Sequence, residues 1–172
     1  MTTFHRILVG VDDTPAARKA LLRAVDLVKA GHGRLGLLSS APAPPPLTAA
    51  GPVVVPVSRE RLEQELLQWA RRNVEDAARL VPGEVPITKL VTRGAPGKAL
   101  LREARSGCWD LVVVGQSSRR RRLLRSVGDR LKRRSGVPVL VVHEEPAEPR
   151  RNRRLGLRLR PRRRRPAQPS AA

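Results

Sequence analysis

Aromatic residues are almost absent from this chain of 172 residues, and tyrosine is missing altogether. The three aromatic residues are Phe4, Trp69 and Trp109. Proteins that bind single-stranded nucleic acid commonly stack the bases on aromatic side chains, so the composition argues weakly against that class of protein. Hydrophobic residues still make up 40% of the chain. That content is adequate for a core, and the core must be aliphatic.

Cysteine is nearly absent too. Cys108 is the only one, so no disulfide can form within the chain. The three histidines are scattered, and no Cys or His cluster has the spacing of a metal site. Cys108 precedes an apolar run, and we expect it to be a small core residue rather than a reactive thiol. A cytoplasmic protein without a metal site is predicted.

Long hydrophobic segments are also missing. No apolar run approaches the roughly 20 residues that a membrane-spanning helix needs. The N-terminal sequence MTTFHRILVGVDD lacks the charged start and the apolar segment of a signal peptide. We therefore expect no membrane span.

Acidic residues are few: the chain has 15 Asp and Glu but 35 Lys and Arg, and its net charge is +20. Nearly all of the positive charge is arginine, and such a surface attracts polyanions. From Pro146 onward the sequence contains ten arginines, one acidic residue (Glu148) and few large apolar residues. Burial of so few apolar side chains cannot offset the conformational entropy that the segment would lose on folding. We therefore predict a domain over residues 1–145 and a disordered basic tail over 146–172.

Short apolar runs without alternation recur along the chain, and these are typical of strands that are covered on both faces. Helical patterns separate them. The first helix begins at Thr14-Pro15, a capping hydroxyl followed by a proline at the first helical position, and ends at Gly31. A Pro-rich stretch at about 41–57 predicts a variable surface excursion. The predicted strands are Arg6–Val11, Leu35–Ser39, Val85–Val91, Leu111–Val114 and Val137–Val142; the other helices run from Ser58 to before Pro82, over Lys98–Arg105, and from about Leu123.

This alternation predicts an α/β fold: a doubly wound, five-stranded, mostly parallel sheet with right-handed crossovers and helices on both faces. In such sheets, ligands bind in the crevice beyond the carboxyl ends of the strands. The loop that starts at Gly115 is therefore a candidate functional segment.

Three blocks of sequence resemble universal stress protein domains. VGVDDTPAARKALLRAVDLV resembles their opening, with Asp12 at the position of their first-strand aspartate. TRGAPGKALLREARSGCWDLVVVG resembles their Gly-x-Pro turn, third helix and fourth strand, and LLRSVGDRLKRRSGVPVLVV resembles their last helix and strand. The resemblance implies a Rossmann-like fold related to the adenine nucleotide alpha hydrolases, a role in the stress response, and a homodimer that pairs through Val137–Val142.

Family members that bind ATP carry the pattern Gly-x2-Gly-x9-Gly-Ser/Thr, in which glycines let backbone N–H groups close on phosphate. Here Gly115 holds the first position, but Ser118 holds the second. Gly128 has the third-glycine spacing but precedes Asp129, and a second register places Arg125-Ser126 on the final pair. Either way the pattern is broken. By resemblance, the candidate residues for ATP, with Mg²⁺ only alongside it, are Asp12, Gly115, Ser117, Ser118 and Ser126.

The same loop has exchanged glycine for arginine at Arg119, Arg120, Arg121, Arg122 and Arg125. Arginine adopts positive φ less readily than glycine, yet its guanidinium group binds phosphate through paired donors. These arginines are candidate anion-binding residues. The loop has either changed its means of holding a nucleotide or exchanged the nucleotide for another anionic partner, and the sequence leaves both open.

Each candidate also has a purely structural interpretation. Asp12 would serve the turn, Gly115 would free the chain to turn, and Ser126 would cap the last helix. The sequence contains no catalytic constellation, and weak ATP hydrolysis has the least support. We expect a non-catalytic stress-response protein with a degenerate adenine-nucleotide site. The alternative is a nucleotide-free module that binds nucleic acid or another polyanion through the Arg-rich loop and tail.

Overall fold

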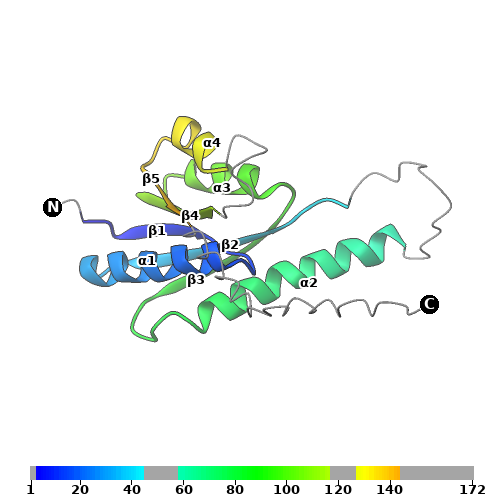
Figure 1. The fold of residues 1–172 in the computed structure, drawn as a ribbon, viewed down its shortest axis with the longest axis horizontal. Coiled ribbons are helices and arrows are strands. Elements are labelled where there is room, and N and C mark those ends of the chain that lie inside the picture. Colours follow the sequence, from blue (N-terminus) through cyan, green and yellow to red (C-terminus); the bar gives the residue numbers. More distant parts are fainter. Residues whose placement is uncertain (1–2, 45–57, 117–126, 144–172) are drawn as a thin grey trace, which may run out of the picture.

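The computed structural model describes residues 3–44, 58–116 and 127–143. Its centre is a five-stranded sheet of order β3-β2-β1-β4-β5 (Figure 1), in which every pairing is parallel. The predicted fold class is confirmed. The strands are β1 (Arg6–Gly10), β2 (Arg34–Ala41), β3 (Ile87–Arg93), β4 (Leu111–Gln116) and β5 (Val139–His143).

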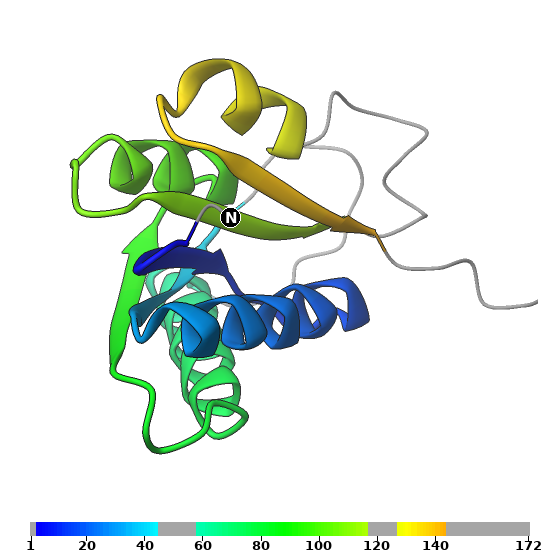
Figure 2. The same cartoon turned by 90° about the vertical axis from the view of Figure 1, so that its left-hand side faces the viewer.

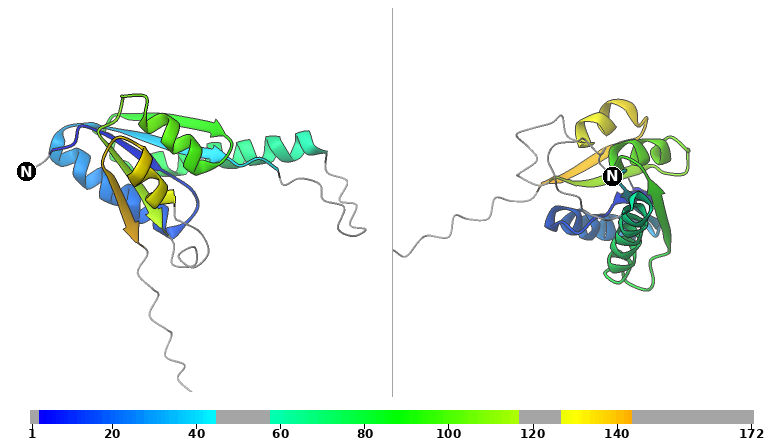
Figure 3. Two further views of the ribbon diagram at one scale, coloured as in Figure 1. Left: turned by 90° about the horizontal axis from the view of Figure 1, so that it is seen from above. Right: turned by 90° about the vertical axis from the view of Figure 1, so that its right-hand side faces the viewer.

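Four helices cover the sheet in two layers (Figure 2), as the alternating sequence predicts. Helices α1 and α2 pack on one face, and α3 and α4 pack on the other. The amino-terminal part of α2 projects beyond the sheet (Figure 3), and its Leu62, Leu66 and Trp69 are only half-buried. The helices are α1 (Pro15–Gly31), α2 (Arg59–Ala78), α3 (Pro96–Ala104) and α4 (Val127–Arg134).

The first helix begins as predicted, but His32 rather than Gly31 provides the left-handed residue at its end. The Thr14 side chain accepts a hydrogen bond from the Ala17 N–H at 3.2 Å, and Pro15 follows at the first helical position. At the other end His32, with φ of 50°, takes the left-handed conformation. Gly31 is still helical, and a Cβ there would lie 2.5 Å from the Phe4 carbonyl oxygen. Close packing against the N-terminal segment therefore requires a residue without a Cβ at position 31.

Other boundaries differ by a few residues. Strand β2 extends to Ala41 and β3 begins at Ile87, because Leu35 to Ala41 pair in register with Ile87 to Arg93. Helix α2 ends at Ala78, in agreement with the predicted end before Pro82. The predicted start of the last helix near Leu123 lies outside the described residues.

Cys108 is exposed, so its prediction as a core residue was wrong. The turn at Gly107, with φ of 78°, places Cys108 on the surface and sends the next residue, Trp109, inward. The Trp109 ring lies over Gly36, where a Cβ would be 2.2 Å from it, and the Trp109 Nε1–H donates to Glu103 Oε1 at 2.9 Å. The Trp109 ring, and not the Cys108 side chain, is therefore the buried group at this position.

The core is aliphatic apart from Trp109. The larger cluster joins Ile7, Val9 and Leu37 to the inner faces of α1 and α2. The smaller joins Leu8 and Val112 to α3 and to α4. No helix in the described ranges is long and apolar enough to cross a membrane. The predicted division at residue 145 and the Pro-rich excursion fall largely outside those ranges and stay predictions.

Candidate functional site

The strand order reverses at β1, which has β2 on one side and β4 on the other. The carboxyl ends of these strands therefore diverge into a crevice at the place where open α/β sheets bind ligands. A cavity of about 300 Å³ lies there. Its walls come from the ends of β1, β2 and β4 and from the beginnings of α3 and α4, with Trp69 of α2 at its border.

Asp12 stands at the end of β1 and lines this crevice. Its Oδ1 accepts hydrogen bonds from the Thr14 N–H at 2.9 Å and from the Thr14 hydroxyl at 2.5 Å. Thr14 in turn caps α1, so Asp12 fixes the turn from strand to helix. The structural interpretation of Asp12 therefore holds, and the second carboxylate oxygen has no protein partner within the described part of the chain. A residue held in this way can present that oxygen to a ligand without further ordering.

Gly115 lies at the end of β4, on the opposite wall from the β2 residues. A Cβ at this position would lie 2.3 Å from the Ala16 carbonyl carbon and 2.5 Å from the Ala17 nitrogen. The amino terminus of α1 therefore packs directly on the backbone of β4. Gly115 allows this approach, whereas the sequence suggested a turn. The same approach brings the positive end of the α1 dipole to the crevice.

Polar side chains that the sequence analysis did not single out line the end of β2. Ser39 and Ser40 are buried, with 2% and 4% of their surface exposed. The Ser40 hydroxyl donates to the Gly94 carbonyl at 2.6 Å, and Asn73 Nδ2 of α2 donates to the Ser39 Oγ at 3.4 Å. Buried polar groups of this kind are normally hydrogen-bonded, and these serve to hold β2, β3 and α2 together at the crevice.

Sequence signals for these residues existed. Ser39-Ser40 ends an apolar strand, as Asp12 follows one, and Asn73 interrupts the buried stripe of Ala70, Val74 and Ala77. Polar residues at such positions indicate a site or a polar contact, and only the fold brings these two signals together.

The rest of the crevice is apolar. Leu38, Leu100, Val114 and Val127 line it, and the described lining residues include no lysine and no arginine. Such walls suit a flat, weakly polar group, with the Asp12 carboxylate as an acceptor at the edge. The described walls hold no side-chain cation for a phosphate.

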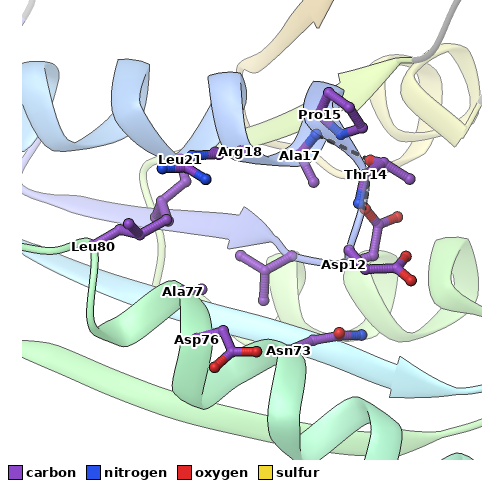
Figure 4. A pocket seen from close by; sticks show the side chains of 12 residues that line it. Asp12, Thr14, Pro15, Ala17, Arg18, Leu21, Asn73, Asp76, Ala77 and Leu80 are labelled. Atoms are coloured by element: carbon purple, nitrogen blue, oxygen red, sulfur yellow. Dashed lines mark hydrogen bonds between the residues drawn. The ribbon is translucent and has the colours of Figure 1, made fainter.

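A second hollow of about 420 Å³ lies between α1 and α2 and shares Val11, Asp12 and Ala17 with the crevice. Figure 4 shows Pro15, Arg18 and Leu21 on the α1 side, and Asn73, Asp76 and Ala77 on the α2 side. Asp12 thus stands at the junction of two hollows, and its neighbour Asp13 lines only the second.

Two of the predicted site residues, Asp12 and Gly115, come together at this crevice. The other candidates, Ser117, Ser118, Ser126 and the arginines 119–122 and 125, lie outside the described residues. Within the described ranges, no group of three or more His, Cys, Asp and Glu side chains could hold a metal ion.

Comparison with known proteins finds one matching family and several similar solved structures. The model of the universal stress protein family matches residues 3–143. A solved structure from the same family in Burkholderia pseudomallei is 25% identical, with a TM-score of 0.63, and the match covers 83% of this chain and 98% of that chain. The universal stress protein UspA from Lactobacillus plantarum is 21% identical, with a TM-score of 0.60 and coverage of 83% and 99%.

A universal stress protein from Archaeoglobus fulgidus, solved in complex with dAMP, is 14% identical, with a TM-score of 0.60 and coverage of 82% and 99%. A search of the curated proteins finds no match. These three solved structures share the fold of this chain.

Proposed function

Because the chain belongs to the universal stress protein family, we propose that it is a cytoplasmic binding protein of the stress response whose crevice takes an adenine nucleotide. The observation that carries this proposal is the crevice itself. It lies where the strand order reverses, it is walled by apolar side chains, and it has the fixed carboxylate of Asp12 at its edge. The dAMP complex of the Archaeoglobus fulgidus relative supports the ligand class.

The described walls suit the nucleoside better than the phosphates. Leu38, Leu100 and Val114 offer apolar contact to a base, and the free oxygen of Asp12 can accept a hydrogen bond from a ribose hydroxyl or an exocyclic amine. Since those walls lack side-chain cations, the phosphates of ATP would depend on the α1 amino terminus and on residues 117–126. We therefore propose that the chain distinguishes adenine nucleotides by the nucleoside.

Calorimetric titration of the full chain with ATP, AMP and inorganic pyrophosphate tests this proposal. We expect micromolar binding of ATP, weaker binding of AMP, and no competition by pyrophosphate for the site that AMP occupies. Asp12→Asn retains an acceptor for Thr14 and removes the charge. It should weaken ATP binding by roughly tenfold or more, the order of a charged hydrogen bond.

Asp13→Asn is the matched control, because it removes the same charge one residue away. Asp13 is exposed and does not line the crevice. Equal losses for the two substitutions, or equal heats for ATP and pyrophosphate, would show that the chain responds to phosphate charge alone and would contradict an adenosine site.

The two edges of the sheet support a proposed homodimer through β5. Edge strand β3 carries the exposed residues Thr88, Lys89 and Arg93, and charged residues protect an edge from pairing. Edge strand β5 carries four half-buried apolar side chains, from Val139 to Val142. Light scattering at micromolar concentration should give twice the chain mass, and Val141→Lys should halve it, whereas Thr88→Lys should not. A monomer before substitution would contradict the dimer.

A further inference from the structure

The surface of α3 and α4 carries charge of predominantly one sign. These helices of 9 and 8 residues contain six cations and two acids. One acid, Glu103, accepts the hydrogen bond from the buried Trp109. The other, Asp129, lies in the first turn of α4, where a negative charge is favourable to the helix dipole. Both helices end with basic residues close by, and α3 is followed directly by Arg105.

The two helices lie side by side on one face of the sheet (Figure 2). At their amino-terminal ends the backbone of Gly97 packs against Val127, since a Cβ there would lie 3.4 Å from both Val127 methyl groups. At their carboxyl ends the Arg105 Nε–H donates to the Arg134 carbonyl at 2.8 Å. Contacts at both ends show that the helices run parallel and in register. Their outer faces therefore form one continuous surface.

The cations occupy the outward positions of both helices. On α3 the residues Gly97, Leu100 and Ala104 are buried, and Lys98 and Arg102 are exposed one turn apart, with Arg105 three residues further. On α4 the buried positions are Gly128 and Leu131, followed by Ser135 just beyond its end, so the residues between them face solvent. We call the resulting surface the α3–α4 basic face: Lys98, Arg102, Arg105, Arg130, Arg133 and Arg134.

Most of this charge has no internal partner. Within the ranges that the structure describes, the side chains of Lys98, Arg102, Arg130 and Arg133 take part in no ion pair and no hydrogen bond. Like charges four residues apart on a helix, such as Lys98 and Arg102, destabilise it slightly. An unpaired basic surface thus disfavours the fold, and an external polyanion would relieve the repulsion.

We propose that the α3–α4 basic face binds the phosphate backbone of duplex nucleic acid. Lys98 to Arg105 spans about 10 Å along α3 at 1.5 Å per residue, and α4 lies beside it at the roughly 8–10 Å of packed helices. Such an area reaches about four phosphates. Arginine, which provides five of the six cations, pairs with phosphate through two parallel donors.

The residues around this charge favour a duplex over other polyanions. Binding to single strands relies on aromatic stacking, and neither α3 nor α4 contains an aromatic residue. Binding in a membrane surface needs an apolar helix face that is free to insert. Here the apolar faces are buried in the core, and among the described residues Val127 is the one exposed large hydrophobic side chain on these helices. A rigid surface that offers only charge suits a backbone contact without base readout.

The test is fluorescence anisotropy of the full chain with a labelled, mixed-sequence DNA duplex of about two helical turns, between about 50 and 200 mM salt. The test variant carries Lys98→Gln, Arg102→Gln, Arg130→Gln and Arg133→Gln. Each phosphate contact contributes about −0.9 to the slope of log affinity against log salt. We expect the variant to lose about three to four units of that slope.

The matched control removes four unpaired arginines from the opposite layer: Arg18→Gln, Arg23→Gln, Arg71→Gln and Arg72→Gln. All four are exposed and have no ion pair within the described part of the chain. The control has the same net charge as the test variant, so a difference in binding between them reflects the position of the cations and not their number. Equal slopes for test variant and control would overturn the proposal. So would a test variant that binds the duplex as the control does but loses binding to vesicles that contain an anionic phospholipid, since the face would then be a lipid surface.

A second readout uses the unmodified chain and does not depend on the folding of any variant. A vicinal dicarbonyl reagent modifies exposed arginines, and mass spectrometry locates them. The duplex should protect Arg102, Arg130 and Arg133 several-fold and leave Arg71 and Arg72 reactive. Equal reactivity of the two groups in the presence of duplex would contradict the assigned face.

Discussion

The two helical layers of the sheet differ in how their surface charge is balanced. Helices α1 and α2, of 17 and 20 residues, contain eight cations and six acids. On α2, Arg59 pairs with Glu63 at 3.2 Å and Arg61 with Glu65 at 3.4 Å. Helices α3 and α4 contain six cations and two acids in 17 residues, and Lys98, Arg102, Arg130 and Arg133 take part in no ion pair within the described part of the chain. Among the four helices, the excess of positive charge is therefore concentrated on the layer formed by α3 and α4.

The layers differ in anchoring as well. Helix α1 buries eight residues, from Ala16 to Gly31. Helix α4 buries two, Gly128 and Leu131. One layer is thus held by many contacts along long helices, whereas α4 depends on a single large side chain. The predictions that follow test these differences, from the largest expected effect to the smallest.

Gly115→Ala should be the most destabilising of these substitutions. The new Cβ would overlap the backbone at Ala16, at 2.3 Å, and a helix backbone cannot rotate away as a side chain can. We expect a loss of about 3 kcal/mol or more in the free energy of unfolding, at the upper end for overpacking. Chemical denaturation measures it. Gly83→Ala is the control, because nothing lies within 4 Å of its added Cβ; an equal effect there would remove the argument from close packing.

Leu131→Ala tests the single anchor of α4. Leu131 is fully buried, and truncation of such a residue costs about 3 kcal/mol. Amide hydrogen exchange should accelerate first in α4 and β5, because no other large side chain of α4 is buried. Leu22→Ala, at a side chain that is 47% exposed on α1, should change stability by less than about 0.5 kcal/mol. Uniform acceleration across both layers would contradict separate anchoring.

Neutralising one cation in each layer should give effects of opposite sign. Arg61→Gln removes an ion pair with Glu65, and stability should fall by about 0.3 kcal/mol at low salt. Lys98→Gln relieves its repulsion with Arg102 and removes a cation from the first turn of α3, where the helix dipole disfavours it, so stability should rise by a similar small amount. Thermal unfolding at low salt measures both, and both effects should vanish when salt screens them. The same sign for the two substitutions would show that the layers do not differ electrostatically.

Glu84 offers the smallest effect. Its carboxylate accepts a backbone hydrogen bond and also lies 3.0 Å from the Lys29 Nζ of α1, and these contacts lower the pKa of Glu84 below its ordinary 4.5. A lowered pKa stabilises the folded state above the ordinary pKa, and the contribution is lost as pH falls through the lower value. The melting temperature of Glu84→Gln should therefore be slightly below that of the unmodified chain at pH 7, and the difference should disappear in acid. An equal difference between the two proteins at pH 7 and in acid would contradict this origin of the effect.

Much of the fold could be predicted because its signals are local. Unbroken apolar runs predicted all five strands, and helical periodicity predicted α1, α2 and α3 within a few residues. The start of α1 at Thr14-Pro15 was correct because capping depends on neighbouring residues alone. Boundaries that depend on a partner strand were less accurate: β2 runs on to Ala41 because β3 continues beside it.

Of the candidate site, the sequence could supply the members but not the arrangement. Asp12 and Gly115 were recognisable as residues that follow apolar runs. The roles of Ser39 and Asn73 were not, since their contact joins residues 34 positions apart in the chain. Likewise, the outward cations of α3 and α4 are separated by a strand and a loop in sequence, and they become one surface only when both helices pack on the same face.

The sequence by itself determined the order of elements, the aliphatic core, the excess of arginine and the likeness to universal stress proteins, because periodicity, capping and composition act over neighbouring residues. Tertiary structure alone decided that Gly115 admits the amino terminus of α1, that Trp109 rather than Cys108 turns inward over Gly36, and that Arg105 bridges to α4. Each of these is a contact between elements that are distant in the sequence. Such distances depend on how whole strands and helices pack, and no local pattern of residues encodes them.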